Sequence, residues 1–199
     1  MTEGVGAVGR PRRSSQRILE EAAAELFLEQ TYAGTTIDQI AARAGVSRNT
    51  FFNYFPAKSD LLWVDFDETM SRLAGELAAT SADQAPMDAV RTAITAVAAS
   101  HPADTVPWAL TQYELMGTRD ELQASGLARF MKQADVLDRF LTERLGAGPS
   151  TQAIAFAVLA AAAAAAGVWA RAGVSRHPLA EYVDAAVAPV CDGFARAAA

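Results

Sequence analysis

The sequence predicts an all-α protein in two parts: an N-terminal three-helix domain with a helix-turn-helix motif, and a C-terminal domain made only of helices. The first observation is that apolar residues recur at spacings of three and four along most of the 199-residue chain. The second is that no segment alternates apolar and polar residues on both sides of an Asn-Gly or Asp-Gly turn, as hairpins do. With 51% hydrophobic residues, the chain can bury a sizeable core.

Residues 1–13 contain Gly, Pro and Arg without apolar periodicity, which predicts a flexible basic arm. Its positive charge comes from Arg10, Arg12 and Arg13. Such an arm either reaches into a DNA minor groove or stays solvated, and the sequence leaves both open. No apolar stretch follows the charge, which is not typical of a signal peptide, so we expect a cytoplasmic protein.

Residues 14–60 are predicted to form the helix-turn-helix domain. Its first helix spans about residues 15–29, where Ile18, Ala22 and Leu26 share one face, and Gly34 breaks the chain after it.

Two short helices joined by a glycine turn follow, which is the helix-turn-helix pattern. Thr36 and Gln39 have the spacing of a capping box at the start of the second helix. Gly45 stands where a left-handed residue would end that helix. Ser47 is a good N-cap for a third helix over residues 48–55, which Pro56 prevents from continuing.

The third helix is predicted to have an aromatic face and an amide face. At 100° per residue, Phe51 and Phe55 lie on one side, and Asn49 and Asn53 lie on the other. The N-terminal end of such a helix enters the DNA major groove, where Asn pairs with adenine and Arg with guanine. We therefore predict Arg48, Asn49 and Asn53 as base readers.

Side chains next to this face are suited to the DNA backbone. The hydroxyl groups of Thr50 and Tyr54 and the charge of Lys58, at the start of the next helix, are candidate phosphate contacts. Phe52 either touches a thymine methyl group or a sugar, or covers the first helix. The pattern alone also fits a ligand-binding helical protein or an enzyme whose helix-turn-helix segment does not regulate transcription.

Residues 18–62, including the run TTIDQIAARAGVSRNTFFNYFPAKSDLL, resemble the N-terminal domain of TetR-family transcriptional regulators. The resemblance implies that Thr36 touches phosphate, that residues 48–53 supply base contacts, and that Tyr54 and Lys58 grip the DNA backbone. Position 52 is most often Tyr in the family and is Phe52 here, so a phosphate contact through that hydroxyl is absent.

A narrower resemblance lies in residues 50–67, TFFNYFPAKSDLLWVDFD, with paired Phe residues, Trp63 and an acidic element from Asp65 to Asp67. This run is similar to TetR-type regulators found beside mycofactocin genes, some of which respond to acyl-CoA. The resemblance implies a largely apolar, acyl-CoA-like inducer.

Residues 61–199 are predicted to form the ligand-binding and dimerisation domain. Helices are expected over residues 59–79, 86–100, 105–116, 119–145, 151–172 and 178–197. The family resemblance implies that the last two helices form a four-helix bundle with those of a second copy. An alanine-rich helix also needs neighbours on several sides to be stable, which a homodimer supplies. Such a dimer would read a palindromic double-stranded operator.

A candidate inducer pocket combines large apolar side chains with one hydroxyl group on the helices over residues 105–116 and 119–145. Its candidate residues are Trp108, Leu110, Tyr113, Met116, Phe130 and Met131. Aromatic and Met residues at helical spacing also fill ordinary cores, so that interpretation stays open. Arg129 or Lys132 would meet an anionic ligand or face the solvent.

The sequence offers no set of residues typical of catalysis. His101 and His177 each precede Pro in turn-like segments, and Cys191 is the single cysteine, so no nucleophile stands beside a base. Metal-ligand spacings and a glycine-rich phosphate loop are missing. We expect neither an enzyme nor a bound metal or cofactor.

Residues 153–170 carry no charge and just reach the length of a membrane span. Most are alanine, which supplies little hydrophobic surface, and the flanks lack aromatic and basic anchors. We therefore expect a buried soluble helix and no membrane partner.

The net charge of −6 argues at first against binding to nucleic acid. However, residues 1–60 hold seven basic and seven acidic residues, whereas residues 61–199 hold ten basic and sixteen acidic ones. All of the excess acid therefore belongs to the C-terminal domain. We expect modest non-specific DNA affinity and a specificity that depends on a few well-placed groups.

Overall fold

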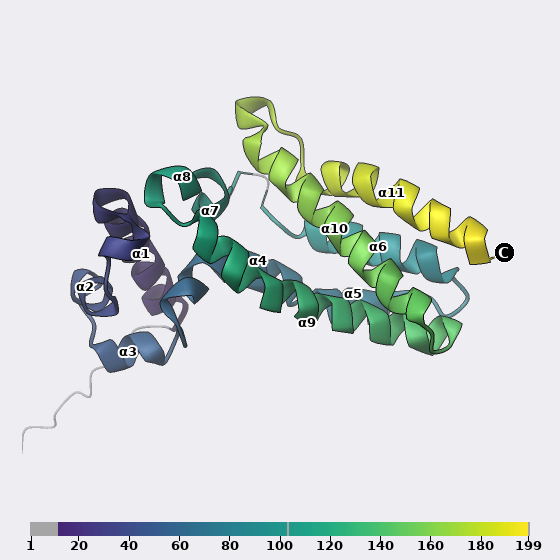
Figure 1. Cartoon of the computed structure of the whole chain (residues 1–199), viewed down its shortest axis with the longest axis horizontal. Coiled ribbons are helices and arrows are strands. Elements are labelled where there is room, and N and C mark those ends of the chain that lie inside the picture. Colours follow the sequence, from purple (N-terminus) through teal and green to yellow (C-terminus); the bar gives the residue numbers. More distant parts are fainter. Residues whose placement is uncertain (1–11, 103, 199) are drawn as a thin grey trace, which may run out of the picture. The chain divides into compact units, whose positions relative to one another are not determined.

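The computed structural model describes residues 12–102 and 104–198, and every regular element among them is helical (Figure 1). The all-α prediction is confirmed. The chain divides into two compact units. Unit 1 comprises Met1–Leu62 and Gln112–Asp120, and unit 2 comprises Trp63–Thr111 and Glu121–Ala199.

The described residues of unit 1 form four complete α-helices. They are α1 (Arg12–Gly34), α2 (Ile37–Arg43), α3 (Arg48–Phe52) and α8 (Tyr113–Met116). The core of the unit is built from large side chains that are each at most 1% exposed: Leu19, Phe27, Ile40, Phe51 and Leu61. Helix α2 packs against both α1 and α3, which fixes the helix-turn-helix pair on its supporting helix.

Helix α1 is longer than the sequence predicted. It begins at Arg12, within the segment that was predicted to be an arm, and it runs past residue 29 to Gly34. The extension includes a kink at Thr31, whose backbone has φ 67° and ψ 164°. Arg12 and Arg13 lie in the first turn of this helix, whereas Arg10 lies outside the described residues.

The prediction of a single helix over residues 105–116 is wrong. The structure has two short helices, α7 (Trp108–Thr111) and α8, separated at Gln112, whose φ of −112° and ψ of 7° are not helical. The break also separates the two units, because α7 belongs to unit 2 and α8 packs against α1 in unit 1. The sequence had assigned this whole stretch to the C-terminal domain.

The prediction of one continuous helix over residues 59–79 is also wrong. Its place is taken by the 3₁₀ segment η1 (Lys58–Trp63), α4 (Val64–Met70) and α5 (Leu73–Ala79). The hydroxyl group of Ser71 donates to the carbonyl oxygen of Glu68 at 2.6 Å, at the point where α4 ends. Serine side chains that bond their own backbone in this way compete with helix propagation.

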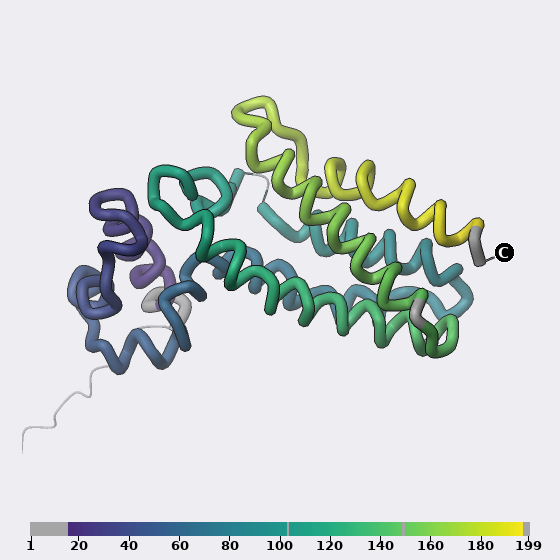
Figure 2. Tube along the Cα trace, viewed as in Figure 1, coloured from purple at the N-terminus to yellow at the C-terminus, as the bar shows by residue number. Residues whose placement is uncertain are grey.

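The remaining helices of unit 2 begin and end close to their predicted limits. They are α6 (Pro86–Ala99), α9 (Arg119–Leu145), which starts in unit 1, α10 (Pro149–Arg171) and α11 (Leu179–Ala198), with the short η2 (Gly173–Ser175) between the last two. Helices α10 and α11 lie side by side, and α11 also packs on α6 (Figure 2). The core between these helices contains fully buried side chains: Val90, Leu137, Leu141, Val158 and Val187.

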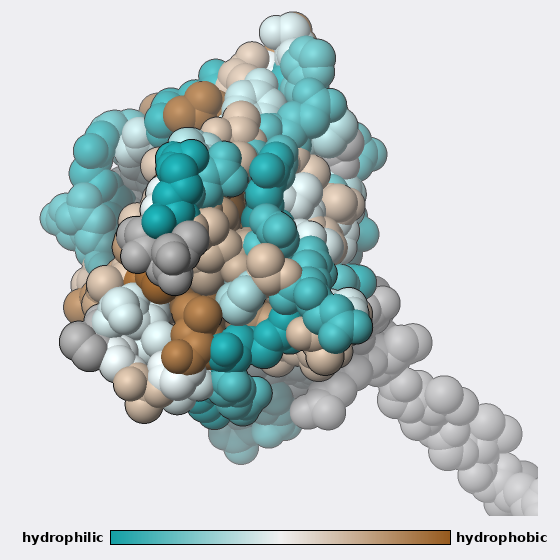
Figure 3. Space-filling view, turned by 90° about the vertical axis from the view of Figure 1, so that its right-hand side faces the viewer, coloured by the Kyte–Doolittle hydropathy of each residue, from teal (hydrophilic) through white to brown (hydrophobic). Residues whose placement is uncertain are grey.

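Helix α10 has the length and composition of a membrane span, with a mean hydropathy of 2.1 over an 18-residue window within Ser150–Arg171. Its packing explains this composition, because Ala155, Val158 and Trp169 are at most 1% exposed within unit 2. The face of the molecule in Figure 3 shows scattered apolar residues among hydrophilic ones. One face of α10 therefore belongs to the core of unit 2.

Candidate nucleic-acid interface

The start of α2 is fixed by the capping box that the sequence predicted. The Thr36 hydroxyl oxygen accepts from the backbone amide of Gln39 at 3.3 Å, and the Gln39 side-chain oxygen accepts from the backbone amide of Thr36 at 2.8 Å. Two backbone amides that a helix N-terminus leaves unpaired are thereby satisfied. Thr36 itself stays exposed at this end of the helix.

The turn between α2 and α3 follows the predicted pattern at its two key positions. Gly45 has φ 68°, and the next amide, of Val46, donates to the Ala41 carbonyl oxygen at 2.9 Å. The Ser47 hydroxyl oxygen then accepts from the amide of Thr50 at 3.0 Å as the N-cap of α3. The turn therefore orients the N-terminus of α3 through local hydrogen bonds.

Helix α3 is shorter than predicted, since it ends at Phe52 and not at residue 55. Phe55 precedes Pro56, and the residue before a proline is driven away from the helical conformation. The predicted division into two faces holds over this shorter span. Phe51 and Phe55 are 0% and 3% exposed and pack with ring centroids 5.6 Å apart.

The opposite face presents the two amides. Asn49 and Asn53 are exposed, and neither side chain takes part in a hydrogen bond within the described part of the chain. Both are therefore available to an external partner. An amide group carries one acceptor and two donors, the set that matches the edge of adenine.

Arg48 is held at the start of α3 by two neighbours. Its Nη1 donates to Asp38 Oδ1 at 2.7 Å, and its guanidinium carbon lies 5.4 Å from the ring centroid of Phe52. Thr50 shares a 2.8 Å hydrogen bond with the Ser47 hydroxyl group. Tyr54 is partly exposed beside them.

Lys58 has a different environment from the one that the sequence suggested. Its ammonium group donates at 2.7 Å to the carbonyl oxygens of both Tyr32 and Thr35, and lies 3.9 Å from the Tyr32 ring centroid. These carbonyl groups stand where α1 ends. The sequence predicts no role for Tyr32 or Thr35. They lie 26 and 23 residues before Lys58, too far for a local pattern to indicate the contact.

Arg43, in the last turn of α2, braces this helix against α1. It donates to Glu25 at 3.0 Å and to Glu29 at 2.8 Å. The hydrogen bond from Arg43 lowers the pKa of Glu29 below its usual value, and the two carboxylates raise the pKa of the guanidinium.

The six candidate ligand residues are divided between the two units. Tyr113 and Met116 lie on α8 in unit 1, where Met116 is 1% exposed. The others belong to unit 2: Trp108 and Leu110 on α7, and Phe130 and Met131 on α9. Phe130 packs against the core and against Phe156, whereas Met131 is 38% exposed.

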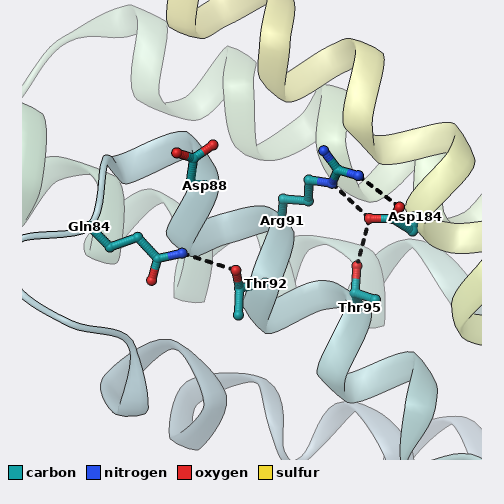
Figure 4. A pocket seen from close by; sticks show the side chains of 6 residues that line it. All are labelled: Gln84, Asp88, Arg91, Thr92, Thr95 and Asp184. Carbon is teal, nitrogen blue, oxygen red and sulfur yellow. Dashed lines mark hydrogen bonds and ion pairs between the residues drawn. The ribbon is translucent and has the colours of Figure 1, made fainter.

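Unit 2 has a polar groove of about 540 Å³ between α6 and α11 (Figure 4). Asp184 of α11 accepts two hydrogen bonds from Arg91, at 2.7 and 2.8 Å, and a third from Thr95. The Arg91 guanidinium lowers the pKa of Asp184. Gln84, which precedes α6, donates to Thr92 of that helix at 3.0 Å. No local pattern in the sequence predicts this groove, because its lining combines two helices that lie about 90 residues apart.

Partly buried polar groups meet at the other end of α6. The ring of His101 packs edge-on against Trp169 and bonds the Thr105 carbonyl oxygen at 2.7 Å through Nε2 and the Thr69 hydroxyl at 3.3 Å through Nδ1. Burial raises the pKa of Asp65, which lies one turn before Thr69 on α4. In the described residues, no group of three or more His, Cys, Asp or Glu side chains is arranged to hold a metal.

Two family models match the chain. The model of bacterial regulatory proteins of the tetR family matches residues 19–62, the segment that holds α2 and α3. The model of the MftR C-terminal domain matches residues 84–195, which is more than half of the chain.

The chain is also similar to individual proteins. It is 29% identical over 168 residues to a Mycobacterium tuberculosis protein named as the mycofactocin biosynthesis transcriptional regulator MftR, covering 82% of this chain and 84% of that one. The fold matches the TetR-family repressor FadR of Thermus thermophilus, solved with lauroyl-CoA, at a TM-score of 0.58 and 23% identity, covering 90% and 94% of the two chains.

FadR of Bacillus subtilis, solved with stearoyl-CoA, gives a TM-score of 0.57 at 19% identity, with 89% and 98% of the chains covered. Proteins of the TetR family are transcriptional regulators and not enzymes. The two family models, together with the capped helix-turn-helix, show that the chain belongs to the TetR family of DNA-binding transcriptional regulators, with a C-terminal domain of the MftR type.

Proposed function

We propose that this regulator is a homodimeric repressor that binds a palindromic operator through α3 and leaves it when a small molecule binds unit 2. The observation that carries the DNA-binding part is the geometry of α3. Ser47 and Gly45 fix its N-terminus, Phe51 anchors one face in the core, and Asn49 and Asn53 stand exposed on the other. A rigid helix with free amides on its outer face is what readout in a major groove requires.

We propose that four side chains around this helix contact or support the DNA backbone: Thr36, Thr50, Tyr54 and Lys58. We also propose that Phe52 contacts a thymine methyl group or a sugar. Arg10, Arg12 and Arg13 are proposed minor-groove contacts. Arg12 and Arg13 lie in the first turn of α1. The protein would act in the cytoplasm, on chromosomal DNA.

The surfaces of α10 and α11 support the homodimer. Three exposed residues of α10, Ala160, Ala164 and Val168, follow one another at four-residue steps. On α11 the exposed residues Ala185, Pro189 and Gly193 have the same spacing. Two adjacent helices thus each present an uncharged stripe of mostly small side chains, which allows the helices of a second copy to approach closely.

The dimer can be tested by light scattering after gel filtration. Ala164→Glu would place a charge in the α10 stripe, and we expect it to shift the parent dimer to a monomer. Ala128→Glu adds the same charge at an exposed position of α9 and should remain dimeric. A monomeric parent, or a dimeric Ala164→Glu variant, would contradict the proposed interface.

The ligand is proposed to be an apolar molecule of the acyl-CoA class. The two FadR proteins were solved with lauroyl-CoA and stearoyl-CoA, and they share this fold. The candidate contacts in unit 2 are Trp108, Leu110, Phe130 and Met131, and the candidates Tyr113 and Met116 belong to unit 1. A long acyl chain would gain most from such large apolar side chains.

The path of the chain suggests how the ligand would act on DNA binding. After α7 the chain leaves unit 2, contributes Gln112–Asp120 to unit 1, and re-enters unit 2 at Glu121. Because α8 packs on α1, a ligand that shifts α7 or the start of α9 would pull on the helix that supports α2 and α3. A coupling of about 1–3 kcal/mol between ligand and DNA is typical of such proteins.

A gel-shift series on the DNA that flanks the protein's own gene tests the whole proposal. We expect sequence-specific retention at moderate salt, with one dimer on each palindromic site, and release on addition of lauroyl-CoA or stearoyl-CoA. Free coenzyme A and a simple detergent serve as controls for the head group and for non-specific apolar binding. Absence of sequence-specific retention would refute the DNA-binding part, and retention unchanged by either acyl-CoA would refute the ligand class.

A further inference from the structure

The guanidinium group of Arg48 is restrained on one edge and on one face before any DNA is present. Asp38 accepts one hydrogen bond from Nη1 at 2.7 Å, and the Phe52 ring lies 5.4 Å from the guanidinium carbon. Asp38 lies in the first turn of α2, whereas Arg48 and Phe52 are the first and last residues of α3. The contact therefore joins the two helices of the motif at the N-terminus of α3.

These contacts leave part of the guanidinium group available. Arginine has five N–H donors in one plane, and Asp38 receives only one of them. Stacking on Phe52 uses a face of the group and not its edges. The donors on Nε and Nη2 form an edge that can give two parallel hydrogen bonds, the arrangement that pairs arginine with O6 and N7 of guanine.

Stability does not account for the ion pair. The side chains of Arg48 and Asp38 are 55% and 66% exposed, and ion pairs this exposed contribute little to folding. A carboxylate beside a DNA-reading helix also opposes the approach of a polyanion. Its position against Arg48 is explained if it restricts the several rotatable bonds of that side chain to one direction, because pre-ordering lowers the entropy lost on binding.

We propose that Asp38 is a positioning residue which, together with the Phe52 ring, fixes Arg48 so that its free edge reads one guanine in each half of the operator. This inference rests on the proposed function of α3 as a reading helix. It adds a specificity determinant on α2, a helix whose own exposed residues were given no part in base recognition. It also gives the Phe52 side chain, which is 42% exposed, a role that needs no contact with a base.

The test compares base preference and not affinity alone. The parent, Asp38→Ala, Asp38→Asn, Phe52→Leu and Arg48→Lys would each select binding sites from a library randomised over one half-site. Dissociation constants would then be measured for the selected site and for sites changed at one base pair. Thermal unfolding of each variant checks that the exposed substitutions leave unit 1 folded.

We expect the parent to prefer guanine over the other bases at one position. Arg48→Lys should lose this preference. Asp38→Ala should reduce this preference about tenfold, while preferences at the other positions stay the same. Asp38→Asn keeps an oxygen acceptor at the same place and should lose less. Phe52→Leu removes the ring on which Arg48 stacks and should also weaken the preference at this position.

Glu21→Gln is the matched control. Glu21 is likewise an exposed acid of unit 1 that pairs with an arginine, Arg17, at 2.9 Å, but on α1. Its removal takes away one negative charge and should raise the affinity for all sequences without changing base preference. If Asp38→Ala behaves like Glu21→Gln, Asp38 acts only as a bulk charge and the inference is wrong.

Two other results would also overturn the inference, and they have different meanings. A parent that binds its operator specifically but shows no guanine preference dependent on Arg48 refutes the role of Asp38 and leaves the proposed repressor intact. A parent that retains no DNA sequence-specifically refutes the proposed function itself, and this inference with it.

Discussion

Lys58 and Tyr32 are joined twice, since the Lys58 ammonium group donates to the Tyr32 carbonyl oxygen at 2.7 Å and lies 3.9 Å from the centroid of the Tyr32 ring. The same group donates to the Thr35 carbonyl oxygen. A helix C-terminus leaves its last carbonyl groups without partners and carries partial negative charge. Lys58 therefore supplies a cation where α1 ends, and ties the start of η1 to it.

Lys58→Met is expected to lower the free energy of unfolding by about 2 kcal/mol, because two charge-assisted hydrogen bonds and a cation–π contact are lost. Chemical denaturation measures this loss. Lys132→Met is the matched control, since Lys132 is the other lysine of the chain and is exposed, and it should change stability by less than about 0.5 kcal/mol. If Lys58→Met keeps the parent's stability and weakens binding to all DNA sequences equally, Lys58 is instead a phosphate contact.

Thr31→Gly is expected to stabilise the protein. The φ of 67° and ψ of 164° at Thr31 fall in a region that only glycine adopts readily, at a cost of about 1–3 kcal/mol for other residues. Glycine gives back about 0.5–1 kcal/mol through the greater freedom of its unfolded chain, so a net gain of about 1 kcal/mol should appear in denaturation curves.

Thr92→Gly provides the comparison for Thr31→Gly, because Thr92 is an exposed residue within α6. Glycine in a helix is unfavourable, so this variant should lose about 0.5 kcal/mol or more. A destabilising effect of Thr31→Gly similar to that of Thr92→Gly would show that the backbone at Thr31 is not strained.

Gly126→Ala is expected to destabilise unit 2, although alanine is the better helix former. A Cβ atom at Gly126 would lie 3.0 Å from Cη2 of Trp63, and the ring is held by a 2.8 Å hydrogen bond to Ser125 and by Arg129 stacked 5.2 Å away. Forced displacement of a packed ring costs about 1–3 kcal/mol, more than the roughly 1 kcal/mol gained from helix propensity.

The control for Gly126→Ala is Gly75→Ala in α5, where an added Cβ would meet nothing within 4 Å. This variant should gain up to about 1 kcal/mol in stability. Tryptophan fluorescence should change only in Gly126→Ala. Equal stabilisation by the two substitutions would mean that Trp63 moves aside freely.

Cys191 should react slowly with iodoacetamide at pH 8 in the folded protein. It is 2% exposed, and burial raises the pKa of its thiol from 9.0 to about 11, so its thiolate fraction at pH 8 is about 100-fold below that of a free cysteine. Reaction at the rate of a free thiol in native buffer would contradict the burial of Cys191.

The same shift in the pKa of Cys191 predicts a pH dependence of stability. Since the folded protein holds the proton more tightly than the unfolded chain, the free energy of unfolding should fall as pH rises from about 9 towards 11. Cys191→Ala should flatten the decline, and an identical decline in both proteins would assign it to other groups.

Local signals carried the correct part of the prediction of fold. Thr36 with Gln39, Gly45 and Ser47 each act within a few residues, so their caps and turn could be predicted from spacing alone. The errors occurred where such signals were weak. Gln112 breaks the helix predicted over residues 105–116 without a proline or glycine, and Ser71 ends α4 through a bond to its own backbone.

The candidate site shows the same division. The opposite faces of Phe51 and Asn49 follow from helical periodicity, which is a local property. The pairing of Asp38 with Arg48 and the capture of Lys58 by Tyr32 and Thr35 depend on how separate helices meet. No spacing rule predicts such contacts, because they are set by the packing of the folded unit.

The discontinuity of unit 1 bears on protein engineering. Its body includes Gln112–Asp120, so a construction that joins only the first 62 residues to a foreign sensor would omit α8 and uncover the surface of α1 on which that helix packs. Met116, which is 1% exposed, would have no counterpart in such a chimera. Hybrid regulators made from this chain would therefore need two grafted segments, with the foreign sequence entering between them and again after residue 120.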